Sequence, residues 1–105
     1  MDNERQSLSR LVRFEKIFRE NLRIVYLEIE NESASHSGHY DGDGESHWRV
    51  LIVADNFKDL ARVRRHQLVN DLVKDEFSSG LHALTLQLFD AGEWEKKKQN
   101  HFDQP

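Results

Sequence analysis

Histidines with metal-ligand chemistry are concentrated in one short polar stretch of this sequence. Residues 33–48, SASHSGHYDGDGESHW, contain His36, His39 and His47 beside several acidic residues, and the chain has no cysteine. Imidazole and carboxylate groups are suitable ligands for zinc and other borderline metals. The HxxH spacing here lacks the fixed spacing of a zinc finger and the helical frame of a zincin. Composition alone therefore favours a solvated loop over an autonomous metal site.

A further histidine, His82, stands near the start of the apolar run LHALTLQLF. In a strand, residues two apart share a face, which places His82 with Leu84, Leu86 and Leu88. On residue type alone, the ordinary interpretation is a hydrogen-bonded histidine at the edge of the core. Its position at the strand start is also compatible with one ring nitrogen facing solvent.

A basic run, RVRRHQ, contains Arg62, Arg64 and Arg65 and could form a spot for phosphate. Such a run is more often the solvated face of an amphipathic helix. The chain as a whole is acidic, with 15 Lys and Arg against 19 Asp and Glu, so nucleic acid binding would depend on this local patch. The chain contains no cysteine nucleophile, glycine-rich phosphate loop or ordered Ser-His-acid motif, so we predict that it is not an enzyme.

The totals set limits on the whole chain. Its 105 residues suffice for one modest core, so we expect a single domain over 1–105, with its core at about 8–95. Without cysteine, any iron-sulfur chemistry must take its sulfur from another molecule. No apolar run approaches the roughly 20 residues of a membrane span, and the start MDNERQ is too polar for a targeting signal. We expect no membrane association and a cytoplasmic location, with the mitochondrial matrix as the alternative.

Three runs rich in β-branched and aromatic residues predict the strands that position these histidines, at 23–30, 47–55 and 81–89. In the first strand, alternation places Val25, Leu27 and Ile29 on one face. The first two strands are expected to be antiparallel neighbours, joined by a long connection at 31–46. A loop of this length is often functional.

Helices are predicted before and between the strands. Three- and four-residue spacing predicts an amphipathic helix from Ser7 to about Asn21 that lies on a sheet. Its apolar residues are Leu8, Leu11, Val12, Phe14, Ile17 and Phe18. A short turn and a longer helix, ended by Gly80, are predicted from the same spacing of Leu60, Val63, Leu68, Val69, Leu72, Val73 and Phe77. A last helical turn is expected in DAGEWEKKK, before a frayed polar tail at 99–105. The result is an α+β fold, a three-stranded sheet with helices on one face.

Four blocks in this order, ESASHSGH, GESHWRVLIVADNF, RRHQLV and GLHALTLQLFDAGEWE, resemble the BolA family. The resemblance covers roughly residues 8–95, and the linked blocks are more specific than any single one. It implies an α+β fold similar to the class II KH domain, in the order αββααβ. Two residues depart from the family pattern: Asp59 replaces the usual Gly two places after the motif Phe, and Gln67 replaces the usual Arg after RH. They weaken inferences about surface contacts of that helix and leave the histidines untouched.

The resemblance also implies a function. BolA proteins form heterodimers with monothiol glutaredoxins that bind a [2Fe-2S] cluster, and they act in iron-sulfur cluster assembly, delivery and iron regulation. The family's ligands are a histidine at the start of the last strand, which His82 matches, and a loop histidine or cysteine. His36 matches the loop ligand by its spacing after ES, and His39 by its closeness to ESHW. Glutaredoxin and glutathione would supply two thiolates, so no cluster is expected in the isolated protein.

Two competing functions remain open. Bacterial family members are also described as transcriptional regulators, so a DNA-binding regulator would use the KH-like surface and the patch of Arg62, Arg64 and Arg65. The acidic balance and the absence of a GxxG loop count against it. An autonomous metal-binding protein would use the loop histidines. The sequence does not distinguish a monomer from a weak homodimer.

Overall fold

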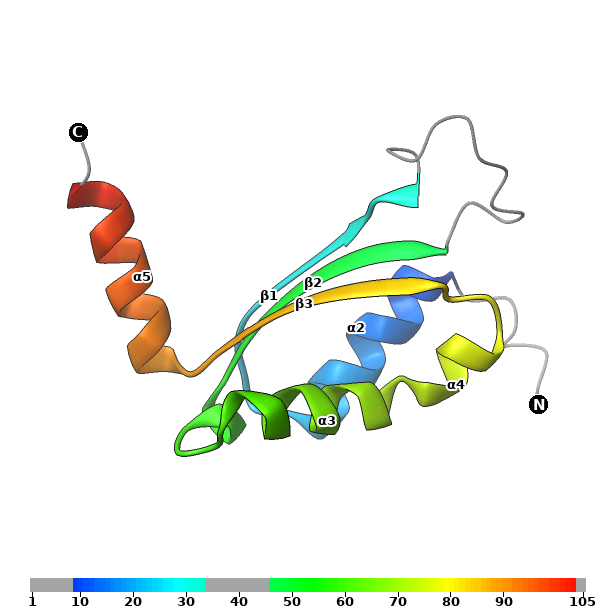
Figure 1. The fold of residues 1–105 in the computed structure, drawn as a ribbon, viewed down its shortest axis with the longest axis horizontal. Coiled ribbons are helices and arrows are strands. Elements are labelled where there is room, and N and C mark those ends of the chain that lie inside the picture. Colours follow the sequence, from blue (N-terminus) through cyan, green and yellow to red (C-terminus); the bar gives the residue numbers. More distant parts are fainter. Residues whose placement is uncertain (1–8, 34–45, 104–105) are drawn as a thin grey trace.

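The structure, a computed structural model, describes residues 9–33 and 46–103. Figure 1 shows a three-stranded sheet with helices packed around it. The elements are α2 (Arg10–Asn21), β1 (Ile24–Asn31), β2 (His47–Ala54), the short 3-10 helix η2 (Asp55–Phe57), α3 (Arg62–Leu72), α4 (Lys74–Ser78), β3 (Ala83–Phe89) and α5 (Ala91–Asp103). The predicted α+β class and the order αββααβ are confirmed, with α5 as a further helix after β3.

β2 is the central strand of the sheet, whose order is β1-β2-β3. β1 pairs with it antiparallel, as predicted, and β3 pairs with it parallel, with His47 opposite Ala83. A parallel pair needs a long crossover connection, and α3 and α4 provide it. The amino-terminal ends of β2 and β3 therefore meet at the same end of the sheet.

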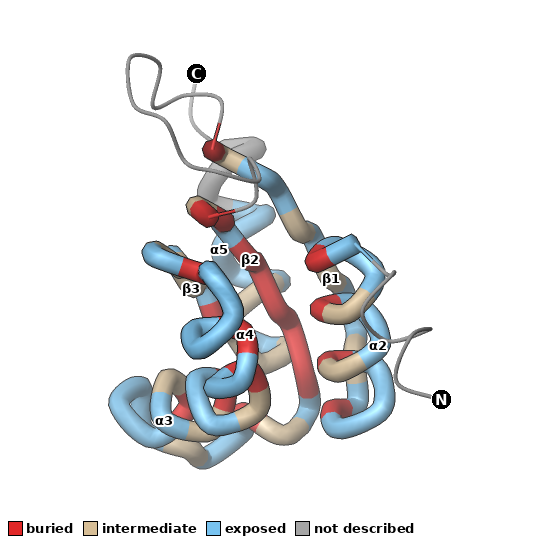
Figure 2. Tube along the Cα trace, turned by 90° about the vertical axis from the view of Figure 1, so that its right-hand side faces the viewer, coloured by how far each residue is buried: buried red, intermediate tan, exposed pale blue. Residues whose placement is uncertain are grey.

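The hydrophobic core lies between the sheet and the helices α2, α3 and α4. In Figure 2, β2 is buried along most of its length. Phe14 and Phe18 of α2 are fully buried, and the Phe14 ring meets the Trp48 ring edge to face, at 5.5 Å between centroids. Each such buried side chain stabilises the fold by roughly 1.5–3 kcal/mol, so β2 and α2 together provide much of the frame that holds the strand ends.

The helix faces differ in part from the expected ones. Ser9 caps α2 by accepting a hydrogen bond from the Val12 N–H, and the buried stripe is Arg10, Phe14 and Phe18. This stripe follows one face at four-residue spacing, which leaves the predicted core residues Leu11 and Val12 exposed. Val63 of α3 and Phe77 of α4 are exposed as well. Apolar spacing correctly placed Phe14, Phe18, Val69 and Val73 in the core, but it did not separate them from the exposed apolar residues of the same helices.

Three local backbone features depart from regular geometry. The β1 register shifts between Ile24 and Tyr26, so Ile24 packs against the core while Val25, predicted to face it, is exposed. Gly80, which has a positive φ of 114°, follows the end of α4 as predicted. Asp59 also has a positive φ, of 64°, a conformation that glycine adopts more easily.

α5 is longer than the predicted single turn and continues to Asp103 through the expected tail. A reciprocal cap begins it: the Glu93 N–H donates to Asp90 Oδ1 at 2.8 Å, and the Asp90 N–H donates to Glu93 Oε1 at 2.9 Å. Trp94 stacks on Tyr26, which lies on the sheet face opposite the core residue Leu27. α5 thus adds a helix on the second face. No helix in the described ranges 9–33 and 46–103 is long and apolar enough to cross a membrane.

Candidate metal centre

His82 lies directly before β3, and its side chain is exposed. Its main-chain N–H donates to the Ser46 carbonyl at 2.8 Å, and the Ala83 N–H donates to the same oxygen at 3.0 Å. Among the described residues, the His82 ring makes no hydrogen bond. Within the described part of the chain, the ring is therefore exposed at the strand start and not hydrogen-bonded at the edge of the core. It is an exposed imidazole on a main chain that Ser46 fixes.

A second imidazole, that of His47, lies beside His82. The two ring centroids are 6.2 Å apart, and the ring planes meet at 85°. His47 Nδ1 is hydrogen-bonded to Ser46 Oγ at 2.8 Å. The parallel pairing of β2 with β3 brings these residues together, because it sets His47 opposite Ala83.

The end of β1 reaches the same place through Ser33. The buried Ser33 hydroxyl accepts a hydrogen bond from the His47 N–H at 3.0 Å, and the Glu32 N–H donates to the His47 carbonyl at 2.7 Å. We call this meeting point of the three strand ends, formed by Ser33, Ser46, His47 and His82, the neck. The connection between β1 and β2 starts and ends at the neck.

The two loop candidates, His36 and His39, lie outside the described residues. Within residues 9–33 and 46–103, no group of three or more His, Asp or Glu is arranged to hold a metal ion. The neck nevertheless has suitable donor atoms, because the imidazole nitrogens of His47 and His82 are of the type that iron and other borderline metals accept. Two imidazoles do not complete four-fold coordination, so a metal group here would need ligands from elsewhere.

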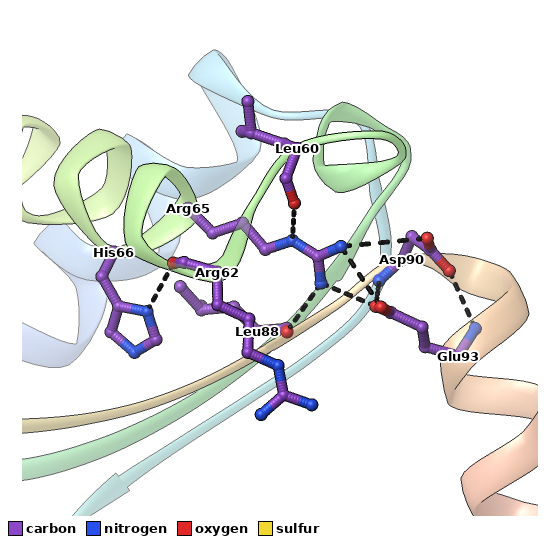
Figure 3. Close-up of polar contacts among 7 residues, drawn as sticks. All are labelled: Leu60, Arg62, Arg65, His66, Leu88, Asp90 and Glu93. Carbon is purple, nitrogen blue, oxygen red and sulfur yellow. Dashed lines mark hydrogen bonds and ion pairs between the residues drawn. The ribbon is translucent and has the colours of Figure 1, made fainter.

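Arg65 of the predicted arginine patch is buried, and Figure 3 shows its guanidinium hydrogen-bonded to groups of the protein itself. Its Nε donates to the Leu60 carbonyl at 2.7 Å, and its Nη1 donates to the Leu88 carbonyl at 3.2 Å and to Glu93 Oε1 at 2.6 Å. The Arg65 hydrogen bond, together with the Asp90 N–H, lowers the pKa of Glu93. Its guanidinium therefore joins α3, β3 and α5 and does not offer a phosphate contact.

The remaining two residues of the patch, Arg62 and Arg64, are exposed on α3. They lie on the helix that follows η2, whereas His82 stands before β3. The structure thus does not bring the predicted patch and the predicted metal ligands into one site. The patch is reduced from three arginines to two because Arg65 turns into the protein.

A second buried charge cluster, which sequence reasoning missed, joins α2 to α4. Arg10 Nε and Arg13 Nε each donate to a Glu76 carboxylate oxygen at 2.8 Å, and Arg10 also donates to the Ser79 carbonyl at 2.9 Å. Burial raises the pKa of Glu76, but the hydrogen bonds from Arg13 and Arg10 outweigh it and leave that pKa below its usual value. The sequence feature that could have indicated a buried Arg10 is its four-residue spacing from Phe14, which places both on the same face of α2.

A hollow of about 330 Å³ lies at the opposite end of the sheet from the neck. It is lined by Asp55, Lys58, Asp90, Ala91 and Gly92. These residues follow β2 and β3, whereas His47 and His82 stand at the beginnings of those strands. The hollow and the histidine pair are therefore separate features.

Comparisons with known proteins agree with this architecture. The family described as BolA-like protein matches residues 18–93. The chain is 43% identical over 75 residues to the DNA-binding transcriptional regulator BolA of Haemophilus influenzae, covering 71% of this chain and 69% of that protein. Among solved structures, BolA1 from Arabidopsis thaliana has a TM-score of 0.76 at 36% identity, covering 82% of this chain and 96% of that one. The BolA domain of SufE1 from Arabidopsis thaliana has a TM-score of 0.73 at 39% identity, covering 83% and 99%. The resemblance in the sequence is thus confirmed, and the chain belongs to the BolA family.

Proposed function

We propose that this protein is a non-enzymatic partner of a monothiol glutaredoxin and shares a [2Fe-2S] cluster with it. The role would lie in iron-sulfur cluster assembly and delivery or in iron regulation. One observation carries the proposal: His82 is an exposed imidazole on a fixed main chain, beside both ends of the connection that contains His36 and His39. These are the two positions at which the family resemblance expects ligands.

The ligand arithmetic supports a shared site. A [2Fe-2S] cluster takes four ligands, and this chain has no cysteine to supply a thiolate. His82 and one loop histidine would supply two nitrogens, while glutaredoxin and glutathione would supply two thiolates. Exchange of thiolate for imidazole reduces the negative charge of such a cluster and raises its reduction potential.

Chain length bears on the choice between the two loop histidines. His36 is three positions from Ser33, the nearest residue of the neck in the sequence, and His39 is six positions from it. The shorter separation favours His36 as the second ligand.

The first experiment is anaerobic reconstitution of the protein with a monothiol glutaredoxin and glutathione, followed by visible absorption and circular dichroism. We expect a heterodimer spectrum that differs from that of glutaredoxin alone. His82→Ala should abolish it, and either His36→Ala or His39→Ala should alter it. His66→Ala is the matched control, because His66 is on α3 and its Nδ1 lies 3.0 Å from the Arg62 carbonyl, away from the neck. A spectrum identical to that of glutaredoxin alone would reject the shared cluster.

The second candidate function, DNA binding, is favoured by the name of the Haemophilus influenzae relative and by the exposure of Arg62 and Arg64. If these two residues contact phosphates, Arg62→Ala/Arg64→Ala should weaken binding to duplex DNA. The slope of log K against log salt should fall by about 1 for each lost contact. Arg65 is left unchanged, because its loss would disturb the fold. Absence of binding by the wild type at low salt would reject this candidate.

A further inference from the structure

We propose that His47 is a positioning residue for His82. Ser46 holds the His47 ring, and the His47 ring sets the orientation of the His82 imidazole before any partner binds. The consequence for a cluster rests on the proposed function, because it matters only if His82 is a ligand. The contact itself belongs to the isolated protein and can be measured there.

Ser46 is fully buried. Its carbonyl oxygen accepts hydrogen bonds from the N–H groups of His82 and Ala83, and its hydroxyl is bonded to His47 Nδ1 at 2.8 Å. One residue thereby fixes the main chain of one histidine and the ring of the other. Because a buried hydroxyl has no bulk water as a substitute partner, breaking its bond to His47 is costly.

The rings of His47 and His82 lie in contact. They meet edge to face, with 6.2 Å between their centroids and 85° between their planes, an arrangement that aromatic pairs prefer. The His82 side chain is exposed, so its χ angles are restricted by few neighbours. Among the described residues, His47 makes the only ring contact to His82.

Restricting the His82 ring lowers the entropic cost of binding a metal group. An exposed side chain that samples several rotamers loses that freedom when it binds a metal group. A ring already held in one orientation loses less, so the complex forms more readily. Groups that orient a metal ligand commonly affect metal affinity by about 10–100-fold. His47 would act on His82 in this manner, through the shape of its ring.

Its main chain supports the same assignment. The His47 N–H and carbonyl are both bonded to the end of β1, through Ser33 and Glu32. Its ring is half-buried and bonded to Ser46, while the His82 ring is exposed. The N–H, the carbonyl and the ring of His47 are thus all hydrogen-bonded, which suits a positioning residue. The exposed His82 ring is accessible to a group shared with a partner.

The test begins with the isolated protein. Ring-proton NMR shifts of His82, assigned with His82→Ala, should differ from those of an unstructured histidine. His47→Ala should move them toward the unstructured values, and Ser46→Ala should do so in part. His47→Phe retains an aromatic ring but loses the nitrogen that bonds Ser46, so it should displace the shifts only in part, as Ser46→Ala does. His66→Ala should change nothing. His82 shifts that stay the same in His47→Ala would overturn the proposal.

The second arm uses the reconstituted complex with glutaredoxin and glutathione. His47→Ala should weaken cluster retention by about 10-fold. His47→Phe should weaken it less, because its ring remains but the bond to Ser46 is lost. If His47→Phe loses the cluster as fully as His47→Ala, the His47 nitrogen is itself a ligand and the positioning role is wrong. If His82→Ala retains the full spectrum, the proposed function fails, while the NMR arm still decides whether His47 orients His82.

Discussion

Arg65 uses its whole guanidinium group on partners inside the protein. It bonds the Leu60 and Leu88 carbonyls and the Glu93 carboxylate, and it lies over the Phe57 ring at 5.8 Å. A lysine cannot serve these partners at once, because its ammonium is a compact point donor. Arg65→Lys should therefore lower the free energy of unfolding by about 2–3 kcal/mol, since hydrogen bonds to charged groups contribute about 1.5–3 kcal/mol each.

Chemical denaturation checks this prediction, with Arg64→Lys as the matched control on the same helix. Arg64 is exposed, so its replacement should change the free energy of unfolding by no more than about 0.5 kcal/mol. Equal effects of the two substitutions would mean that the Arg65 hydrogen bonds contribute little to stability.

Asp59 offers a test of backbone strain at a single residue. Its φ of 64° is a conformation that residues with a Cβ adopt at a cost and glycine adopts freely. Asp59→Gly should raise the free energy of unfolding by about 0.5 kcal/mol, and Asp59→Ala should lower it, with about 1 kcal/mol between the two variants. Thermal unfolding of both proteins measures the difference. If the alanine variant is as stable as the glycine variant, the turn does not hold residue 59 at positive φ in solution.

At the scale of the elements, Glu76 joins α4 to α2 through Arg10 and Arg13. The pKa of Glu76 is lowered in the folded state, so its ionised form stabilises the fold above the unfolded-state pKa of about 4.5. That stability is lost as pH falls through the folded-state value. Glu76→Gln should cost about 3 kcal/mol at neutral pH, because it leaves the buried Arg10 without its counter-charge.

The pH profile of unfolding separates this effect from a general loss of packing. The stability of the wild type should decrease more steeply below about pH 4.5 than that of Glu76→Gln, because only the wild type takes up the proton at residue 76 on unfolding. Glu15→Gln is the control, since Glu15 forms an exposed pair with Arg19 at 3.3 Å and should leave the profile nearly unchanged. Parallel profiles for the wild type and Glu76→Gln would contradict the assignment.

Most helices and strands of this fold could be predicted from the sequence, but some of their contacts could not. Periodicity predicted the strands and the main helices to within a few residues, because burial of one face imposes it. It did not predict that Arg10 would take an apolar position on α2, since a buried arginine depends on a partner as distant as Glu76. The reciprocal cap of Asp90 and Glu93 was readable in DAGE, and it would have predicted a full helix in place of one turn.

The candidate site was predictable only in part for a similar reason. The family resemblance pointed to His82 as a candidate, and the structure places its exposed side chain in the neck. The contact between His82 and His47 was not predicted, because the alternation within a strand says nothing about which strand lies next to it. It follows from the parallel register that sets His47 opposite Ala83. The choice between His36 and His39 stays a prediction, since both lie outside the described residues.

At the scale of the whole molecule, the proposed ligand His82 and the hydrogen bonds of Arg65 lie at opposite ends of the sheet. β3 (Ala83–Phe89) separates His82, before its first residue, from the Leu88 carbonyl that accepts from Arg65. At about 3.3 Å per residue, this separation is roughly 20 Å. The exposed His82 side chain at one end contributes little to the fold, and the buried Arg65 at the other makes no hydrogen bond with His82 within the described residues. The molecule should therefore tolerate replacement of His82 with little loss of stability.

A double-mutant cycle of His82→Ala and Arg65→Lys tests this separation. His82→Ala alone should change the free energy of unfolding by less than about 0.5 kcal/mol, and the two effects should add to within about 0.5 kcal/mol, because the sites are distant and share no partner. In reconstitution with glutaredoxin, Arg65→Lys should keep the heterodimer spectrum at a temperature where it is folded, while His82→Ala loses it. A coupling above about 1 kcal/mol would show that β3 transmits strain from one end to the other. Stability of the fold and binding at the neck would then have to be explained together, with β3 as the element that links them.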